Sequence, residues 1–207
     1  MRASEAWFKE MAQSVIAAEI IALQALQDII IGDQFQGLSQ EIADMNGKCI
    51  VTGVGKSAIA ARKIAATLAT IGVQAMFLDP IGMFHGELGL VRLDDIVIMV
   101  SQSGETDELL RLVPPLIAIG AYIVPIVAVE DSSLGRMTGA LVTGCVNDPY
   151  FKVPTASSIA AVALGDALAI VVGERQGFSD RSLAVTHPGG TIGRVVSELA
   201  SSATVDG

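Results

Sequence analysis

The sequence is poor in aromatic and basic residues. Aromatic residues make up only 4% of the 207 residues, which excludes a core built on large rings. The apolar 51% of the chain must therefore pack mainly through Ala, Ile, Leu and Val. Lys and Arg number 13 against 22 Asp and Glu, a formal net charge of −9 at pH 7. This charge argues against nucleic acid or an anionic membrane surface as a partner.

Cysteine, secretion signals and membrane-spanning runs are also scarce. The only cysteines, Cys49 and Cys145, lie in apolar, strand-like stretches, so we expect two free core thiols in a reducing cytoplasm. The first ten residues mix acidic and basic side chains, and no cleavable signal is expected. The longest apolar run, after Ser158, is interrupted by Asp166 and is expected to fall short of the ~18 residues that span a bilayer. We therefore expect a soluble, cytoplasmic protein.

Helical and strand-like patterns alternate along the chain. Strands are predicted at 48–52, 74–78, 96–100, 122–129 and, more weakly, 140–145. Helices are predicted at 4–31, 34–45, 58–71, 105–120, 132–137, 155–173 and 191–200. This alternation predicts one α/β domain over residues 1–207, a three-layer α-β-α sandwich with a five-stranded, mainly parallel, doubly wound sheet of the flavodoxin-like type. Residues 47–200 would form its core and residues 1–46 its N-terminal helices.

The helix predicted at 4–31 is apolar over most of its surface. Its polar residues share one narrow stripe, namely Lys9, Glu10, Gln13, Gln24, Gln27 and Asp28. A helix that packs on one surface only has an apolar stripe on one side, and the apolar surface of this helix is wider than such a stripe. We expect this helix to lie between its own domain and a second subunit.

The most informative stretch is Ser101-Gln-Ser-Gly-Glu-Thr106, which follows the buried strand at 96–100. A helix is expected to begin at about Glu105, with Ser103 as its N-cap. Hydroxyl groups, free backbone N–H groups and the positive end of a helix suit an anion with several oxygens, such as phosphate. Ligands of doubly wound sheets bind at this carboxyl edge.

A second glycine-rich turn, Gly53-Val-Gly-Lys-Ser57, follows the first strand. It is not a Walker A loop, because Ile50 stands where that motif needs glycine. It is also a poor dinucleotide fingerprint, since only Asp79 could serve as the ribose-binding acid. The turn would reach the same edge of the sheet as the stretch at 101–106, so the two turns can hold one small anion between them.

Four further side chains could carry chemistry. Lys56 opens a helix, where a cation is unfavourable unless an anion lies nearby; otherwise it is a solvated lysine. His85 and His187 are the only histidines, and both lie in loops beside glycine. Glu108 lies in the first turn of the helix after the phosphate-binding turn, where it could simply compensate the helix dipole. Metal-ligand spacing among His, Cys and acidic residues is absent, as is a Gly-x-Ser-x-Gly elbow.

Together these motifs resemble the sugar isomerase (SIS) domain family, which binds phosphosugars. The resemblance spans about residues 40–194 and rests on both glycine-rich turns. Phe84-His-Gly-Glu-Leu-Gly89, Glu108 and His187-Pro-Gly-Gly190 resemble the arabinose-5-phosphate isomerase branch, which makes the precursor of 3-deoxy-manno-octulosonate (KDO). The resemblance implies cytoplasmic conversion of D-ribulose 5-phosphate and D-arabinose 5-phosphate, as in lipopolysaccharide synthesis, by a homo-oligomer, expected to be a tetramer with shared active sites.

The resemblance also implies the site residues. The matching catalytic residues are Lys56, His85, Glu108 and His187. The matching phosphate contacts are Ser57, Ser101, Gln102, Ser103 and Thr106, with Gly55 and Gly104 also lining the substrate site. Lys56 would neutralise an enediolate oxyanion, and the histidines would handle ring opening and proton transfer. Either Glu108 or His187 could act as the carbon base. No metal or organic cofactor is required.

The sequence departs from the family in two places. Many members carry a pair of CBS regulatory modules after His187-Pro-Gly-Gly190, and this chain is expected to lack them. The stretch before the helix at 155–173 keeps Pro154-Thr-Ala-Ser-Ser158 but lacks the usual Cys-Pro-Leu-Gly-like residues. Rival functions are a non-catalytic phosphosugar-binding regulator, an isomerase of a hexulose or heptose phosphate, and, more remotely, an NAD(P)-dependent dehydrogenase.

Overall fold

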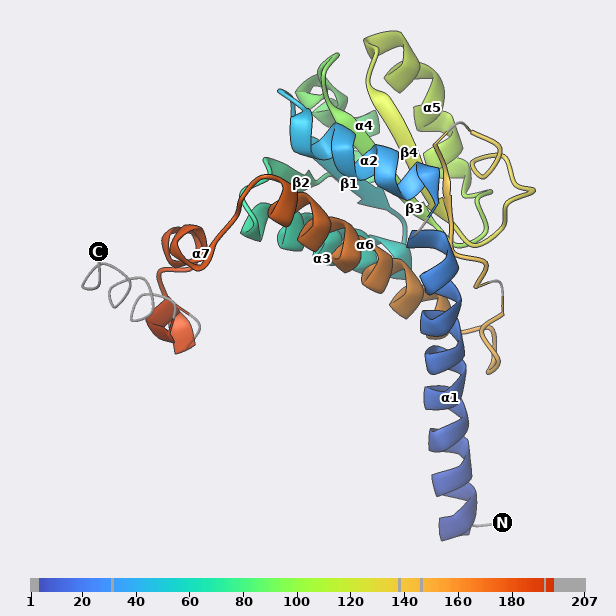
Figure 1. Ribbon diagram of the computed structural model, residues 1–207. Coiled ribbons are helices and arrows are strands. Elements are labelled where there is room, and N and C mark those ends of the chain that lie inside the picture. The colour runs from blue at the N-terminus through green and yellow to red at the C-terminus, as the bar shows by residue number, and fades with distance from the viewer. Residues whose placement is uncertain (1–3, 31, 138, 146, 192, 196–207) are drawn as a thin grey trace.

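The computed structural model describes residues 4–30, 32–137, 139–145, 147–191 and 193–195. Five strands form one sheet (Figure 1): β1 (Cys49–Gly53), β2 (Ala75–Phe77), β3 (Ile96–Ser101), β4 (Tyr122–Val127) and β5 (Leu141–Val142). Their order is β2-β1-β3-β4-β5, and neighbouring strands run parallel. The predicted five-stranded α/β sandwich is therefore confirmed.

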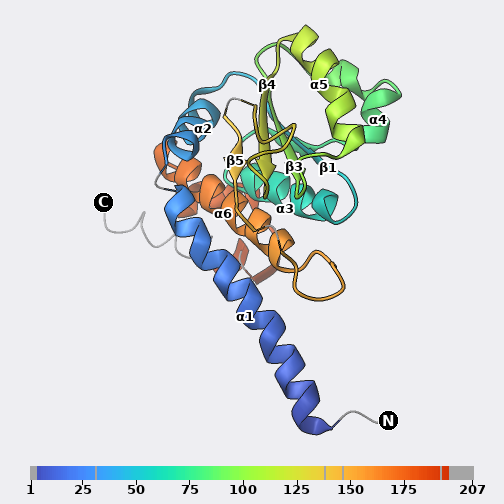
Figure 2. The same cartoon turned by 90° about the vertical axis from the view of Figure 1, so that its right-hand side faces the viewer.

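Helices cover both faces of the sheet (Figure 2). One layer contains α1 (Glu5–Ile30), α2 (Asp33–Asp44), α3 (Lys56–Thr70) and α6 (Ala156–Arg175); the other contains α4 (Pro80–Phe84), the 3-10 helix η1 (Glu87–Leu90) and α5 (Asp107–Ile119). Successive strand residues point to opposite faces, so Val51 and Ile98 pack on the α3–α6 side. Ile50 and Val97 pack on the α5 side. Burial on both faces explains the nearly continuous apolar runs of these strands.

Several predicted local structures are wrong. Residues 132–137 form turns rather than a helix, because the Ser132 hydroxyl bonds the Val129 carbonyl (2.7 Å) and accepts from the Gly135 N–H (3.0 Å). Side-chain bonds of this kind compete with helix formation. Helix α5 begins at Asp107, so Thr106 rather than Ser103 occupies the N-cap position.

Other elements were not predicted or were misplaced at their ends. The short helices α4 and η1 occupy what was expected to be a loop, and α7 (Asp180–Thr186) was not predicted. The strand expected at 140–145 covers only Leu141–Val142. The helix predicted at 191–200 lies largely outside the described residues. These elements are short, so their periodicity carries little signal.

Helices α1 and α6 are each long and apolar enough to cross a membrane by length and composition. The expectation that the run after Ser158 is too short is therefore wrong. Asp166 does not interrupt α6 but pairs with Lys63 of α3. In the most apolar 18-residue window of α6, 56% is buried, and the helix packs against α1, α2 and α3. This is the behaviour of a core helix in a globular domain.

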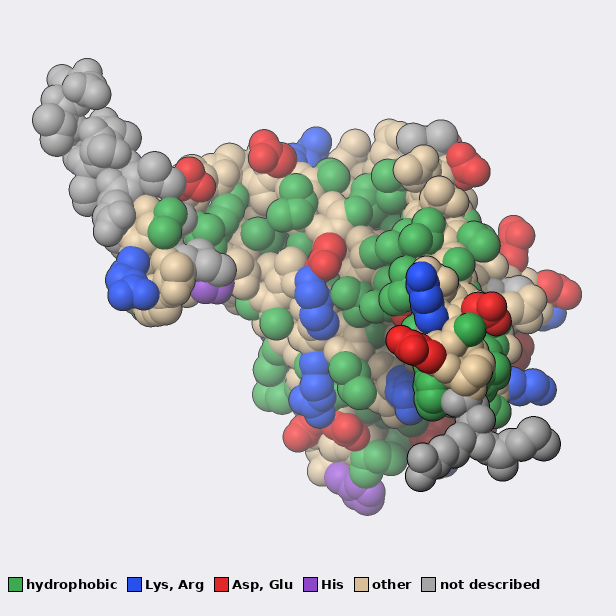
Figure 3. Space-filling model, turned by 90° about the horizontal axis from the view of Figure 1, so that it is seen from below, with side chains coloured by type: hydrophobic (Ala, Val, Ile, Leu, Met, Phe, Trp, Pro, Cys, Tyr) green, Lys and Arg blue, Asp and Glu red, His purple; other side chains and the backbone are tan. Residues whose placement is uncertain are grey.

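Helix α1 is much less covered, because its N-terminal part projects away from the sheet (Figure 1). Only 11% of its most apolar window is buried. Large hydrophobic side chains are exposed along it, namely Trp7, Phe8, Ile16, Ile20, Ile21 and Leu23. Figure 3 shows the face of the molecule on which α1 projects, and hydrophobic side chains are frequent on this face. Helices α3 and α6 also expose large hydrophobic side chains, namely Ile59, Ile159, Ile170 and Val171.

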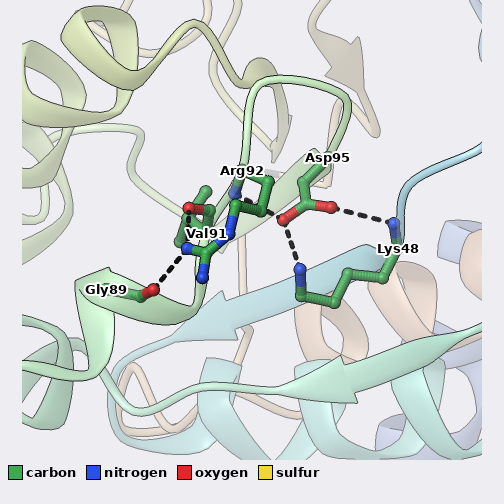
Figure 4. Close-up of polar contacts among 5 residues, drawn as sticks. All are labelled: Lys48, Gly89, Val91, Arg92 and Asp95. Atoms are coloured by element: carbon green, nitrogen blue, oxygen red, sulfur yellow. Dashed lines mark hydrogen bonds and ion pairs between the residues drawn. The ribbon is translucent and has the colours of Figure 1, made fainter.

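At the amino ends of the strands, Asp95 ties β1 to β3 (Figure 4). Its carboxylate accepts from the backbone N–H of Lys48 (2.9 Å) and of Arg92 (2.7 Å), and it pairs with Lys48 Nζ (2.6 Å). Burial opposes ionisation of Asp95, but the hydrogen bonds and the charge of Lys48 outweigh it and lower its pKa below the ordinary value.

Replacing Asp95 by alanine is expected to lower the free energy of unfolding at pH 7 by about 3 kcal/mol, because it leaves two backbone donors and one ammonium without their partner. The folded-state pKa is lowered, so this stabilisation is present at neutral pH and is lost as the pH falls through that pKa. Urea unfolding at pH 7 and in acid measures both effects. The exposed neighbour Asp94→Ala is the control; an equal loss in the two variants would contradict the assignment.

Candidate active site

A polar cavity of about 360 Å³ lies at the carboxyl ends of β1, β3 and β4. Three turns from distant parts of the sequence supply most of its polar lining. These residues are Lys56, Ser57, Gln102, Ser103, Thr106, Thr143, Ser157 and Ser158. The predicted meeting of the two glycine-rich turns is therefore found at the expected edge of the sheet.

The first wall is the start of α3. Gly55 has φ of +60°, a conformation that side-chain-bearing residues rarely adopt, and it turns the chain from β1 into the helix. Lys56 and Ser57 are the first two residues of α3, and both line the cavity. The N-terminal end of this helix and the Lys56 ammonium make the wall electropositive.

The second wall is the turn between β3 and α5. The buried Ser101 hydroxyl accepts from the Gly104 N–H (3.1 Å) and bonds the Thr106 hydroxyl (2.8 Å). Gly104 has φ of +68°, and a Cβ there would lie 2.0 Å from the Ser132 hydroxyl oxygen. Ser101 and Gly104 thus brace the turn without lining the cavity, while Gln102, Ser103 and Thr106 face it.

A neighbouring loop holds this turn in place. The Glu105 carboxylate accepts from the Ser133 N–H at 2.7 Å, which lowers the pKa of Glu105. The Gln102 carbonyl accepts from the Ala128 N–H at 2.9 Å. The turn is therefore shaped before any ligand arrives, which reduces the ordering cost of binding.

The third wall, the start of α6, was missed from the sequence. Pro154, Ser157 and Ser158 line the cavity there. The Asp148 carboxylate caps this helix by accepting from the backbone N–H groups of Thr155 (2.8 Å) and Ser157 (3.1 Å). Burial opposes ionisation of Asp148, but bonds from Ser157 and Thr155 lower its pKa. The sequence feature that could have indicated this wall is Pro154 followed by four small residues, three of which carry hydroxyl groups, at the start of an apolar helix.

His85 and Glu108 lie at the same end of the sheet but do not line this cavity. Glu108 is half-buried in the first turn of α5, two residues after Thr106. His85 ends α4, and its neighbour Phe84 packs under the guanidinium of Arg111 at 5.0 Å. Arg111 is one turn after Glu108, so the residue before His85 packs on the helix that carries Glu108.

The structure does not bring His187 to the cavity. It follows α7, which leaves the body of the domain (Figure 1). The neighbouring Thr186 hydroxyl donates to the carbonyl of Thr70, the last residue of α3 (3.1 Å). Lys56 opens that same helix, so the two ends are about 20 Å apart. His187 Nδ1 is buried and has no hydrogen-bond partner among the described residues.

In the part of the chain that the structure describes, no group of three or more His, Cys, Asp or Glu side chains could hold a metal ion. The two cysteines are buried free thiols, and burial raises the pKa of Cys49 to about 12.

Residues 41–171 match the model of the SIS domain. The chain belongs to the SIS domain family. It is 37% identical over 185 residues to the arabinose 5-phosphate isomerase KpsF of Escherichia coli O6:H1, covering 88% of this chain and 57% of the relative. It is 34% identical over 190 residues to the arabinose 5-phosphate isomerase KdsD of Pseudomonas aeruginosa, and this match covers 90% of this chain and 58% of KdsD. This chain thus spans little more than half the length of these two relatives.

Solved structures of this fold support the same family. A structure of an E. coli CFT073 protein in complex with arabinose 5-phosphate matches with a TM-score of 0.80 and 30% identity, covering 90% of this chain and 100% of that one. The Vibrio vulnificus NanR protein, complexed with ManNAc-6P, matches with a TM-score of 0.69 and 20% identity, covering 94% and 70%. At that identity NanR shows the shared fold alone.

Proposed function

We propose that the protein is an aldose-ketose isomerase that interconverts D-ribulose 5-phosphate and D-arabinose 5-phosphate through an enediolate. The observation that carries this proposal is the polar cavity in which Lys56 meets the hydroxyl-lined turn after β3. The names of KpsF and KdsD and the SIS structure bound to arabinose 5-phosphate support the substrate.

The phosphate would lie between the starts of α3 and α5. Two helix N-termini, the hydroxyls of Ser57, Ser103 and Thr106, and one ammonium converge there. These are the donors and the positive potential that a phosphate dianion needs. Binding the phosphate would orient the sugar carbons for reaction.

Replacing Ser103 by alanine is expected to weaken D-arabinose 5-phosphate binding at least ~10-fold, since a hydrogen bond to a charged group is lost. Calorimetry measures the affinity. Ser133→Ala is the matched control, because Ser133 lies on the neighbouring loop and its N–H bond to Glu105 survives the substitution. Equal affinity of Ser103→Ala and wild type would count against the phosphate site.

The chemistry would be divided among four side chains. Lys56, inside the cavity, would neutralise the oxygen that becomes anionic in the enediolate. A partly buried carboxylate such as Glu108 can take the carbon-bound proton. His85 would assist proton transfer between the sugar oxygens. His187 would open the ring or, as the alternative base, replace Glu108.

His187 would join the active site of another subunit, because in its own subunit it lies near the end of α3 opposite to Lys56. The apolar surface of α1 fits such an assembly, because contiguous exposed apolar patches mark interaction sites. We therefore propose a homo-oligomer, a tetramer, in which neighbouring subunits complete each active site. His187 Nδ1, which is without a partner among the residues that the structure describes, would find one there.

The biological setting is proposed on the same basis. Free buried thiols suit a reducing cytoplasm. D-arabinose 5-phosphate production would then supply KDO for lipopolysaccharide.

The proposal is tested by incubating the protein with a panel of sugar phosphates and following each by ³¹P NMR. Conversion of D-ribulose 5-phosphate into D-arabinose 5-phosphate is expected. Conversion of only a hexulose or heptose phosphate would indicate another isomerase. Tight binding without conversion of any member would indicate a regulator.

A further inference from the structure

The third wall of the cavity contains a hydroxyl whose direction is fixed. Ser157 is 6% exposed and lines the cavity, and its hydroxyl donates to the Asp148 carboxylate at 2.6 Å. The other Asp148 oxygen is engaged by the N–H groups of Thr155 and Ser157 and by the Thr155 hydroxyl. Asp148 therefore holds Ser157 by two bonds.

An ionised carboxylate only accepts hydrogen bonds, so the proton of the Ser157 hydroxyl is committed to Asp148. The lowered pKa of Asp148 keeps this arrangement at neutral pH. What Ser157 has left for a ligand is the lone pairs of its oxygen. It can receive a hydrogen bond but cannot give one.

We propose that Ser157, oriented by Asp148, accepts a hydrogen bond from a hydroxyl group of the sugar and thereby fixes which end of the substrate faces α6. This inference rests on the proposed function, because it assumes a sugar phosphate in the cavity. A phosphate dianion has no proton to give to Ser157, and the nearby Asp148 charge repels it. The phosphate is left to the opposite wall, where Lys56 and Ser103 lie. Ser157 is a binding residue, and Asp148 is a positioning residue.

The test compares two ligands, D-arabinose 5-phosphate and inorganic phosphate, by calorimetry. Inorganic phosphate uses only the wall formed by α3 and α5, so the ratio of the two affinities isolates the sugar contact. Ser157→Ala is expected to lower the preference for the sugar phosphate about 5-fold, the value of one hydrogen bond. Asp148→Asn is expected to lower it similarly. Its amide would donate to Ser157 and turn the serine hydroxyl into a donor.

Two further variants separate positioning from folding. Thr155→Ala removes another side-chain contact of Asp148 outside the cavity, and it should leave the preference unchanged. The double variant Asp148→Asn with Ser157→Ala should match Ser157→Ala alone, because Asp148 acts through Ser157. A variant that is merely less stable would show the wild-type ratio of the two affinities. It would also not make the double variant match Ser157→Ala.

The outcomes distinguish this inference from the function on which it rests. Wild-type protein that binds D-arabinose 5-phosphate, with the same preference in Ser157→Ala, would overturn the sugar contact alone. A further fall in the double variant would overturn the positioning role of Asp148. Wild-type protein that binds inorganic phosphate but no sugar phosphate would overturn the proposed function and this inference together.

Discussion

Replacing Lys56 by alanine is expected to lower kcat for D-ribulose 5-phosphate by about 10²–10³-fold. Lys56 is a cation that lines the cavity, at the start of α3. An ammonium that faces a developing oxyanion stabilises the transition state more than the ground state, so kcat falls more than KM rises. Initial rates over a range of substrate concentrations separate the two.

Lys63→Ala is the matched control for this variant. Lys63 lies on the same helix two turns later, and its ammonium pairs with Asp166 of α6 outside the cavity. It should change kcat by less than about 2-fold, as expected for a partly exposed ion pair. Equal kcat values in Lys56→Ala, Lys63→Ala and wild type would remove Lys56 from the chemistry.

Replacing Glu108 by glutamine is expected to cut turnover at least ~10²-fold while D-arabinose 5-phosphate still binds. The amide keeps the size of the side chain but cannot take a proton from carbon. Turnover and calorimetric affinity, measured on one preparation, separate the two effects. Asp107→Asn, its exposed neighbour in the first turn of α5, controls for the lost helix-dipole interaction.

The Glu108 variant also decides between the two candidate bases. Unchanged turnover in Glu108→Gln would leave His187 as the carbon base, and His187→Asn would then show the large loss. A loss in both variants would give the two side chains separate roles in proton transfer.

The fold could be predicted because its strands carry a strong and simple signal. The residues of β1 and β3 are buried on both faces, so their sequences are nearly uninterrupted apolar runs. The alternation with longer helices then leaves few topologies. Short elements such as α4 and α7 lacked this signal, and a serine hydroxyl overrode the helical pattern at 132–137.

Only those parts of the candidate site that consist of consecutive residues could be predicted from the sequence. The turns after β1 and β3 are short motifs, and parallel strands place them at one edge. The start of α6 reaches the cavity from about fifty residues further along the chain, and Ser157 resembles an ordinary helix-start serine. The orientation of its hydroxyl depends on Asp148, a contact that no periodicity reveals. The assignment of the four catalytic side chains stays a prediction.

The most direct test of the account is ¹H NMR of D-ribulose 5-phosphate incubated with the protein in D₂O. The base that takes a proton from C1 can exchange it with D₂O before it protonates C2 of the enediolate, so D-arabinose 5-phosphate carrying deuterium at C2 is the expected product. The Lys56→Ala variant should form it far more slowly. Absence of D-arabinose 5-phosphate from the wild-type reaction would contradict the isomerase assignment, and product with only protium at C2 would mean that the proton taken from C1 reaches C2 without exchange with solvent.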